Sequence, residues 1–215
     1  MGFLRFVLFI AIATTTSLAQ ASDPVTAFFA KSATDEPVLS YKGSQRLEGT
    51  GFGESGFIEV SVEFREGLFS YQITNEGGSS QVRSKALKPF LEAERNQKHP
   101  ELSAFNGDNY NITLDDKTEG GLTLLNLEPR RKERALISGY LFVDINGDLI
   151  RVEGKPAKSP SFWTFNTKVI RYYSRISGVR VPTKMVSTAT LVCAPSSLVV
   201  TYSYDELNGR KVKQP

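Results

Sequence analysis

Alternating apolar and polar residues dominate the first third of the chain. The stretch FIEVSVEFRE puts four apolar residues on one side of an extended segment: Ile58, Val60, Val62 and Phe64. The stretches LSYKGSQRLE before it and LFSYQIT after it alternate in the same way. A period of two predicts strands with one buried and one wetter face. The short turns between them favour antiparallel hairpins.

The strand pattern returns in the second half of the chain. It covers NYNITL, GLTLLNL, ALISGYLFVD, LIRVEG, FWTFNTKVIRYYS, VRVPTKMVSTATL and SLVVTYSY. With the first three, these make about ten strands in one antiparallel meander. The chain shows no linker and no internal repeat, so residues 22–215 are read as a single domain. We therefore expect a mainly β (α+β) fold, in which ten strands curl strongly or close.

Two segments have the periodicity of helices that pack on this sheet. Asp23-Pro24 is a good N-cap followed by a proline at the first helical position, and an apolar stripe follows at Val25, Phe28 and Phe29. The later segment SSQVRSKALKPFLEAERNQ carries a second stripe, formed by Leu87, Phe90 and Leu91. Pro89 within it predicts either a new helix start or a kink.

Several late strands are apolar on both faces. In LISGYLFV, one face carries Leu136, Tyr140 and Phe142, and the other Ile137, Leu141 and Val143. FWTFNTKVIRYY has the same two-sided character. An antiparallel sheet that is wet on one side does not produce this pattern. Both faces are therefore expected to be covered, either by helices, by a second layer, or by an apolar ligand.

The first 21 residues have the features of an export signal. A basic residue, Arg5, precedes a short apolar run, and the segment ends in Ala19-Gln20-Ala21. This small-x-small pattern predicts cleavage after Ala21 and a soluble periplasmic protein that starts at Ser22. The alternative is a retained membrane anchor, for which the apolar run is short.

Composition narrows the range of partners and cofactors. The 215 residues carry a formal net charge of +3 with mixed signs throughout, which gives no reason to expect a nucleic-acid partner. Cys193 is the only cysteine, so no internal disulfide forms and the fold depends on its core. His99 is the only histidine, which removes most metal sites and Ser-His triads. We therefore expect a monomer with no cofactor, no metal and no catalytic residues.

Two glycine-containing motifs are better explained as turns than as binding loops. GFGESG matches a dinucleotide-binding pattern, but a strand follows it where such a loop needs a helix. DINGD resembles part of a calcium loop, yet Asn146-Gly147 between apolar strands is a strong hairpin signal.

A set of motifs between Ser80 and Tyr204 resembles one family of exported proteins. The motifs are ALKPFLEAE, NYNITL, LLNLEPRRK, GYLFVD, VEGKPAKSPSFW, YSRISGVRVP and SLVVTYSY. They are similar to outer-membrane lipoprotein-sorting-like proteins of the LolA/LolB/RseB lipoprotein-carrier superfamily. The resemblance implies an incomplete, strongly curved antiparallel barrel with helices on its open side. In that superfamily the cavity holds lipid chains or serves as a sensor surface.

The resemblance and the two-sided strands together suggest a non-enzymatic carrier of lipid, acyl chains or lipidated protein. The alternative is an interaction or sensing module of the same fold with a filled core, which binds other envelope proteins. A ligand is expected between the concave face and the two helices, lined by Phe28, Phe29, Leu87, Phe90, Leu91, Phe142, Trp163 and Phe165. The loop KPAKSPS is either a stiff connection between strands or a rim loop whose Lys155 and Lys158 meet anionic head groups.

Overall fold

The computed structural model describes residues 23–96, 104–133, 136–158, 164–191 and 194–213. Within them, eleven strands form one sheet in the order β3-β2-β1-β10-β9-β8-β7-β6-β5-β4, and β11 pairs with β10. The strands are β1 (Ser40–Gly51), β2 (Glu54–Arg65), β3 (Leu68–Gly78), β4 (Tyr110–Glu119), β5 (Leu122–Pro129), β6 (Ile137–Val143), β7 (Leu149–Pro156), β8 (Thr164–Ile176), β9 (Val179–Leu191), β10 (Ala194–Leu207) and β11 (Arg210–Lys211). The expected leader, His99, Trp163 and Cys193 lie outside the described residues.

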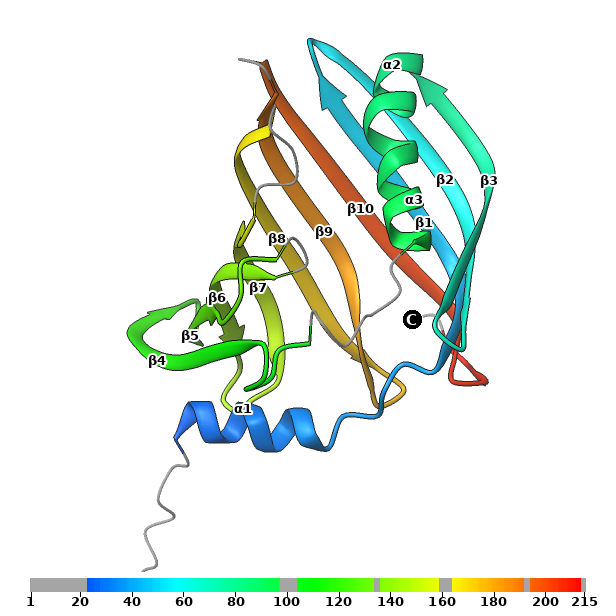
Figure 1. Cartoon of the computed structure of the whole chain (residues 1–215). Helices are drawn as coiled ribbons and strands as arrows, with labels where there is room; N and C mark the ends of the chain where they lie inside the picture. The colour runs from blue at the N-terminus through cyan, green and yellow to red at the C-terminus, as the bar shows by residue number, and fades with distance from the viewer. Residues whose placement is uncertain (1–22, 97–103, 134–135, 159–163, 192–193, 214–215) are drawn as a thin grey trace, which may run out of the picture.

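The sheet is strongly curved and does not close into a barrel. All of its pairs are antiparallel, and β3 and β4 stand at the two ends of the hydrogen-bonded order. Figure 1 shows the strands curving around a concave side, with α3 lying across β1, β2 and β3 and α1 beside the opposite part of the sheet. The predicted fold, an incomplete antiparallel barrel with helices on its open side, is confirmed.

Helix α1 (Pro24–Ala33) begins where the sequence predicts. The carboxylate of Asp23 accepts a hydrogen bond from the backbone N–H of Thr26 at 3.0 Å, and Pro24 occupies the first helical position. Proline costs nothing there because the first N–H groups of a helix have no partner within the helix.

The second helical segment is continuous but changes pitch. It runs through α2 (Ser80–Val82), the π-helical turn η1 (Arg83–Leu87) and α3 (Lys88–Arg95). Pro89 stands in the first turn of α3, directly after the wide turn. A proline lacks an N–H and crowds the carbonyl four residues before it, so a widened turn is a natural response. The predicted start or kink at Pro89 is confirmed.

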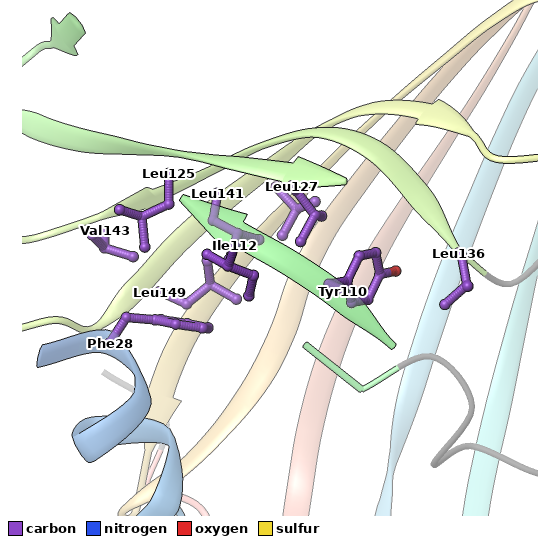
Figure 2. Close-up of a cluster of buried hydrophobic side chains, with 10 residues drawn as sticks. Phe28, Tyr110, Ile112, Leu125, Leu127, Leu136, Leu141, Val143 and Leu149 are labelled. Carbon is purple, nitrogen blue, oxygen red and sulfur yellow. The ribbon is translucent and has the colours of Figure 1, made fainter. Parts of the chain in front are cut away.

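Each helix covers its own hydrophobic cluster on the concave side. Figure 2 shows the cluster of Phe28, here called the α1 cluster: Phe28, Tyr110, Ile112, Leu125, Leu127, Leu136, Leu141, Val143, Leu149 and Val152. The α3 cluster lies at the other end of the sheet and contains Leu47, Ile58, Val60, Val62, Phe69, Val82, Leu87, Leu91, Met185 and Val200. A smaller third cluster contains Val179, Val181, Tyr204 and Leu207. The interior is thus divided into separate packed regions.

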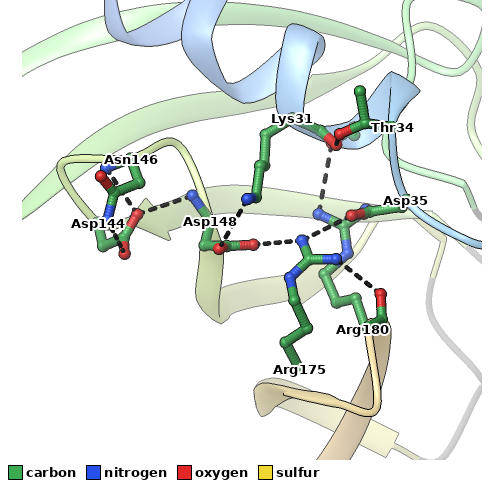
Figure 3. Close-up of polar contacts among 10 residues, drawn as sticks. Lys31, Thr34, Asp35, Asp144, Asn146, Asp148, Arg175 and Arg180 are labelled. Atoms are coloured by element: carbon green, nitrogen blue, oxygen red, sulfur yellow. Dashed lines mark hydrogen bonds and ion pairs between the residues drawn. The ribbon is translucent and has the colours of Figure 1, made fainter.

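A network of ion pairs fixes the C-terminal end of α1 (Figure 3). Arg175 contacts Asp35 at 2.6 Å and Asp148 at 2.5 Å, while Lys31 reaches Asp148 at 3.5 Å and Arg180 reaches Asp35 at 2.9 Å. Partial burial would raise the pKa of Asp148, but Arg175 and Lys31 outweigh it and hold that pKa below its ordinary value. The network therefore ties Lys31 of α1, and Asp35 just after the helix, to the turn before β7 and to the strands β8 and β9.

Both glycine motifs form turns, as predicted. Phe52 and Gly53 have φ values of 55° and 79° in the turn between β1 and β2. In the turn between β6 and β7, the N–H of Gly147 donates to the carbonyl of Asp144 at 3.0 Å. Gly147 also lies against α1, because a Cβ at this position would stand 2.7 Å from the carbonyl carbon of Ala27.

The contact between Gly147 and α1 gives a first prediction. Gly147→Ala should destabilise the fold by about 1–3 kcal/mol more than Gly67→Ala. Both glycines have φ near +80°, but a Cβ at Gly67 would meet nothing within 4 Å. The Gly67→Ala control therefore measures the cost of backbone strain alone, which is about 1–2 kcal/mol. Urea unfolding of the two variants measures the difference, and equal losses would show that α1 does not pack on this turn.

Candidate functional site

A groove of about 660 Å³ lies between the second helical segment and the concave face of β8, β9 and β10. Its wall on the helix side comes from Gln81 through Ala93, and its floor comes from the sheet. The lining residues are Thr50, Gly51, Phe52, Glu54, Gln81, Val82, Lys85, Ala86, Pro89, Phe90, Ala93, Thr167, Ser187, Ala189, Ser196, Ser197 and Leu198.

The groove exists because the second helical segment, from α2 to α3, covers only one end of the concave face. Leu87 packs onto β1 where Gly49 leaves room, since a Cβ at Gly49 would stand 2.8 Å from a Leu87 methyl carbon. The helix is thereby held over β1, β2 and β3, and its other side borders the groove toward β9 and β10. Small side chains such as Ser187 and Ala189 line the sheet side and leave the space open.

The mouth of the groove lies at the turn between β1 and β2. Phe52 lines the groove there and is 60% exposed. A second hollow of about 660 Å³ shares Thr50, Gly51, Glu54, Ala189, Ser196 and Ser197 with the groove. The groove is therefore open at this end, and Lys85 is the cationic side chain among its lining residues.

Polar side chains occupy the interior beyond the inner end of the groove. Arg171 lies on β8 opposite Met185 of β9, and its Nη2 is 3.6 Å from the Met185 sulfur. Glu94 accepts a hydrogen bond from the side-chain amide of Gln45 at 3.3 Å. Burial raises the pKa of the Glu94 carboxyl, although Gln45 and Arg171 lower it in part. A cation and an acid thus face the interior without forming an ion pair among the described residues.

The structure brings only part of the expected lining together. Phe90 lines the groove. Leu87 and Leu91 are fully buried beneath the helix in the α3 cluster. Phe28 is fully buried in the α1 cluster, and Phe29 packs against that cluster. The two helices therefore do not share one cavity, because each presses its apolar stripe into its own packed cluster.

Phe142 lies on the outer face of the sheet rather than on the concave one. Its neighbours Leu141 and Val143 belong to the α1 cluster, and side chains alternate along a strand. The guanidinium of Arg151 stacks on the Phe142 ring at 3.8 Å from the centroid. Phe142 is 3% exposed on this outer face, where Leu124, its partner on β5, is buried as well.

Four expected positions remain, and the structure describes the side chains of only two of them. Trp163 and the side chain of Phe165 lie outside the described part of the chain. Lys155 and Lys158 are exposed at the end of β7 and directly after it, and neither lines the groove. The role of these lysines as a rim stays a hypothesis.

Sequence reasoning missed the floor of the groove and Arg171. Ser187 and Ala189 carry no signal, because small residues at alternate strand positions are common. Arg171 does carry one, since it falls on the same face of β8 as Val169 and Tyr173, inside an apolar two-sided strand. A charge at an inward position of such a strand is a candidate for function.

The described residues contain no helix that is long and apolar enough to cross a membrane. They also hold no group of three or more His, Cys, Asp or Glu side chains suited to a metal ion.

Comparison with known protein families finds no match. Comparison with curated proteins finds none either. Among solved structures, the chain is similar to a LolA superfamily protein from Nitrosomonas europaea, with 10% identity, a TM-score of 0.42, and coverage of 89% of this chain and 94% of that one. It is also similar to an outer membrane lipoprotein-sorting protein domain from Vibrio parahaemolyticus, with 12% identity, a TM-score of 0.44, and coverage of 89% and 95%.

A DUF1329 family protein from Desulfovibrio piger matches with 10% identity, a TM-score of 0.42, and coverage of 85% of this chain and 92% of that one.

The different placement of Leu87 and Phe90 gives a second prediction. Leu87→Ala should cost about 2–5 kcal/mol, because it opens a cavity in a packed cluster. Phe90→Ala should cost only about 1–2 kcal/mol, because that ring is half-buried and already borders the groove. Guanidinium unfolding of both variants provides the measurement. A greater loss for Phe90→Ala than for Leu87→Ala would contradict this placement.

Proposed function

We propose that the chain is an exported, non-enzymatic binding or carrier protein of the cell envelope, whose groove takes an acyl chain of a lipid or lipidated protein. The observation that carries the proposal is the groove of about 660 Å³ between Phe90 and Leu198. Small-molecule sites fall in the range of about 300–1,000 Å³ and are mostly apolar. The leader at residues 1–21 and the single domain at 22–215 belong to the same proposal.

The free energy of binding would come mainly from the apolar walls. Burying one CH₂ group contributes about 0.8 kcal/mol, so a long chain gains several kcal/mol without a directional contact. Ala86, Phe90 and Ala93 of the helix and Leu198 of β10 supply apolar surface along the groove. Serine and threonine side chains between them supply hydrogen-bonding groups at the floor.

A second candidate is an interaction module that binds other envelope proteins and no lipid. It is supported by the tight packing of Phe28, Leu87 and Leu91, which were expected to line a cavity and instead fill the core. The two candidates differ in whether the groove takes up an apolar guest.

A charge placed inside the groove separates these candidates. Ala93→Glu should weaken binding of a fluorescent long-chain acyl probe by at least about tenfold, because a carboxylate would be desolvated beside the chain. Ala93 is exposed on the helix and lines the groove, so the fold should survive. Ser84→Glu, at an exposed position of the same segment that does not line the groove, should bind as the wild type does.

Fluorescence titration with the acyl probe supplies the affinities, and circular dichroism confirms that both variants fold. Absence of saturable binding by the wild-type protein would reject the carrier and leave the interaction module. Equal weakening in Ala93→Glu and Ser84→Glu would reject the groove as the binding site.

A further inference from the structure

We propose that the groove accepts a long-chain carboxylate, a fatty acid, with its tail toward the mouth at Phe52 and its head group on Arg171. This inference rests on the proposed function, because it names the ligand class of the same groove. Three observations carry it: the position of Arg171, its unused hydrogen-bonding capacity and the charge of its surroundings.

Arg171 lies next to the floor of the groove. It is level with the inward-facing residues that follow the lining residues along β9 and β10. On β9, Ser187 lines the groove and Met185 is the next inward residue, paired with Arg171. On β10, Leu198 lines the groove and Val200 follows it, paired with Met185. Two residues along a strand span about 7 Å, so a chain lying in the groove is within reach of Arg171 by its end.

The guanidinium of Arg171 has few partners for its position. Its Nε is enclosed and has no hydrogen-bond partner, and its Nη2 donates to the Met185 sulfur, which is a weak acceptor. The phenol of Tyr173 interacts with it, but no carboxylate forms an ion pair with it within the described residues. Enclosed cations are normally paired, so this one is suited to an anion that the described residues do not supply.

The groups around Arg171 favour binding of an anion that carries a single charge. Burial alone would lower the pKa of Arg171, but Tyr173, Tyr202 and Glu94 outweigh it, so the guanidinium stays cationic. Burial also raises the pKa of Tyr202, which keeps its hydroxyl protonated and able to donate. Glu94 is the nearby acid, and a more highly charged head group, such as a phosphate monoester, would face stronger repulsion from it.

A second enclosed polar atom lies between the groove and Arg171. The hydroxyl of Thr167 is enclosed without a hydrogen-bond partner, and Thr167 lines the groove. Thr167 and Arg171 belong to the same strand, β8. This strand therefore carries polar atoms without a hydrogen-bond partner at both places, and a ligand in the groove could satisfy them.

Calorimetric titration of the full mature chain with palmitate and with hexadecanol tests the head-group site. The two probes share the chain length and differ in charge. The wild-type protein should bind palmitate at least about tenfold more tightly than hexadecanol, because a hydrogen-bonded charge pair is available only to the acid. Arg171→Met should weaken palmitate binding by about 10- to 100-fold and leave hexadecanol binding unchanged.

Two further variants keep the test independent of folding defects. Glu94→Gln should tighten palmitate binding several-fold, since it removes the competing negative charge and keeps a side chain that can accept from Gln45. Arg65→Met removes an exposed cation far from the groove residues and should change neither affinity. If Arg171→Met does not fold, the wild-type probe comparison and Glu94→Gln still decide.

The outcomes distinguish a failure of the head-group site at Arg171 from a failure of the proposed acyl-binding function. Equal affinities of the wild-type protein for palmitate and hexadecanol would overturn the head-group site and leave the acyl groove intact. Tighter binding of hexadecyl phosphate than of palmitate would overturn the choice of a carboxylate. Failure of all three probes to bind would overturn the proposed function itself.

Discussion

The open sheet is the constraint on which the rest of the structure depends. The strand order ends at β3 on one side and β4 on the other, so the concave face is not enclosed by strands. The apolar side chains of this face have to be covered by other elements, because large exposed apolar patches are rare on soluble monomeric proteins. In the described residues, α1 covers one end of this face and the segment from α2 to α3 covers the other. The strip between them, on β8, β9 and β10, is where the groove and Arg171 lie.

Both covers are held by packing, and α1 has polar contacts in addition. Phe28 of α1 is fully buried in the α1 cluster, Lys31 pairs with Asp148, and Gly147 approaches the helix closely. The second helical segment is held by packing, with Leu87 seated on β1 above Gly49. The apolar stripes of both helices are used up in these contacts. What remains for a ligand is the flank of the second segment, where Phe90 and Ala93 face the sheet across the groove.

The sequence predicts the elements well, because their signals are local. Alternation at Ile58 to Phe64, the Asp23-Pro24 cap and the kink at Pro89 each depend on neighbouring residues only. The lining of the site could not be predicted in the same way. Whether Leu87 or Phe90 faces the groove depends on the rotation of the helix over Gly49, and Phe142 on the outer face meets Arg151 from the next strand. Both are tertiary contacts that periodicity does not encode. Arg171 could have been identified from the sequence, because a charged residue at an inward position of an apolar strand can be seen there.

The central claim is that an acyl chain lies in the groove between the second helical segment and β10, and not inside the α1 cluster. Isotope-filtered NMR with unlabelled palmitate and ¹³C-methyl-labelled protein tests it directly. Occupation of the groove should give intermolecular NOEs from the acyl chain to the methyl groups of Ala86, Ala93 and Leu198, which line it. It predicts none to Leu125 or Leu141, which are buried beneath α1. NOEs to Leu125 and Leu141 without any to Ala93 or Leu198 would contradict it.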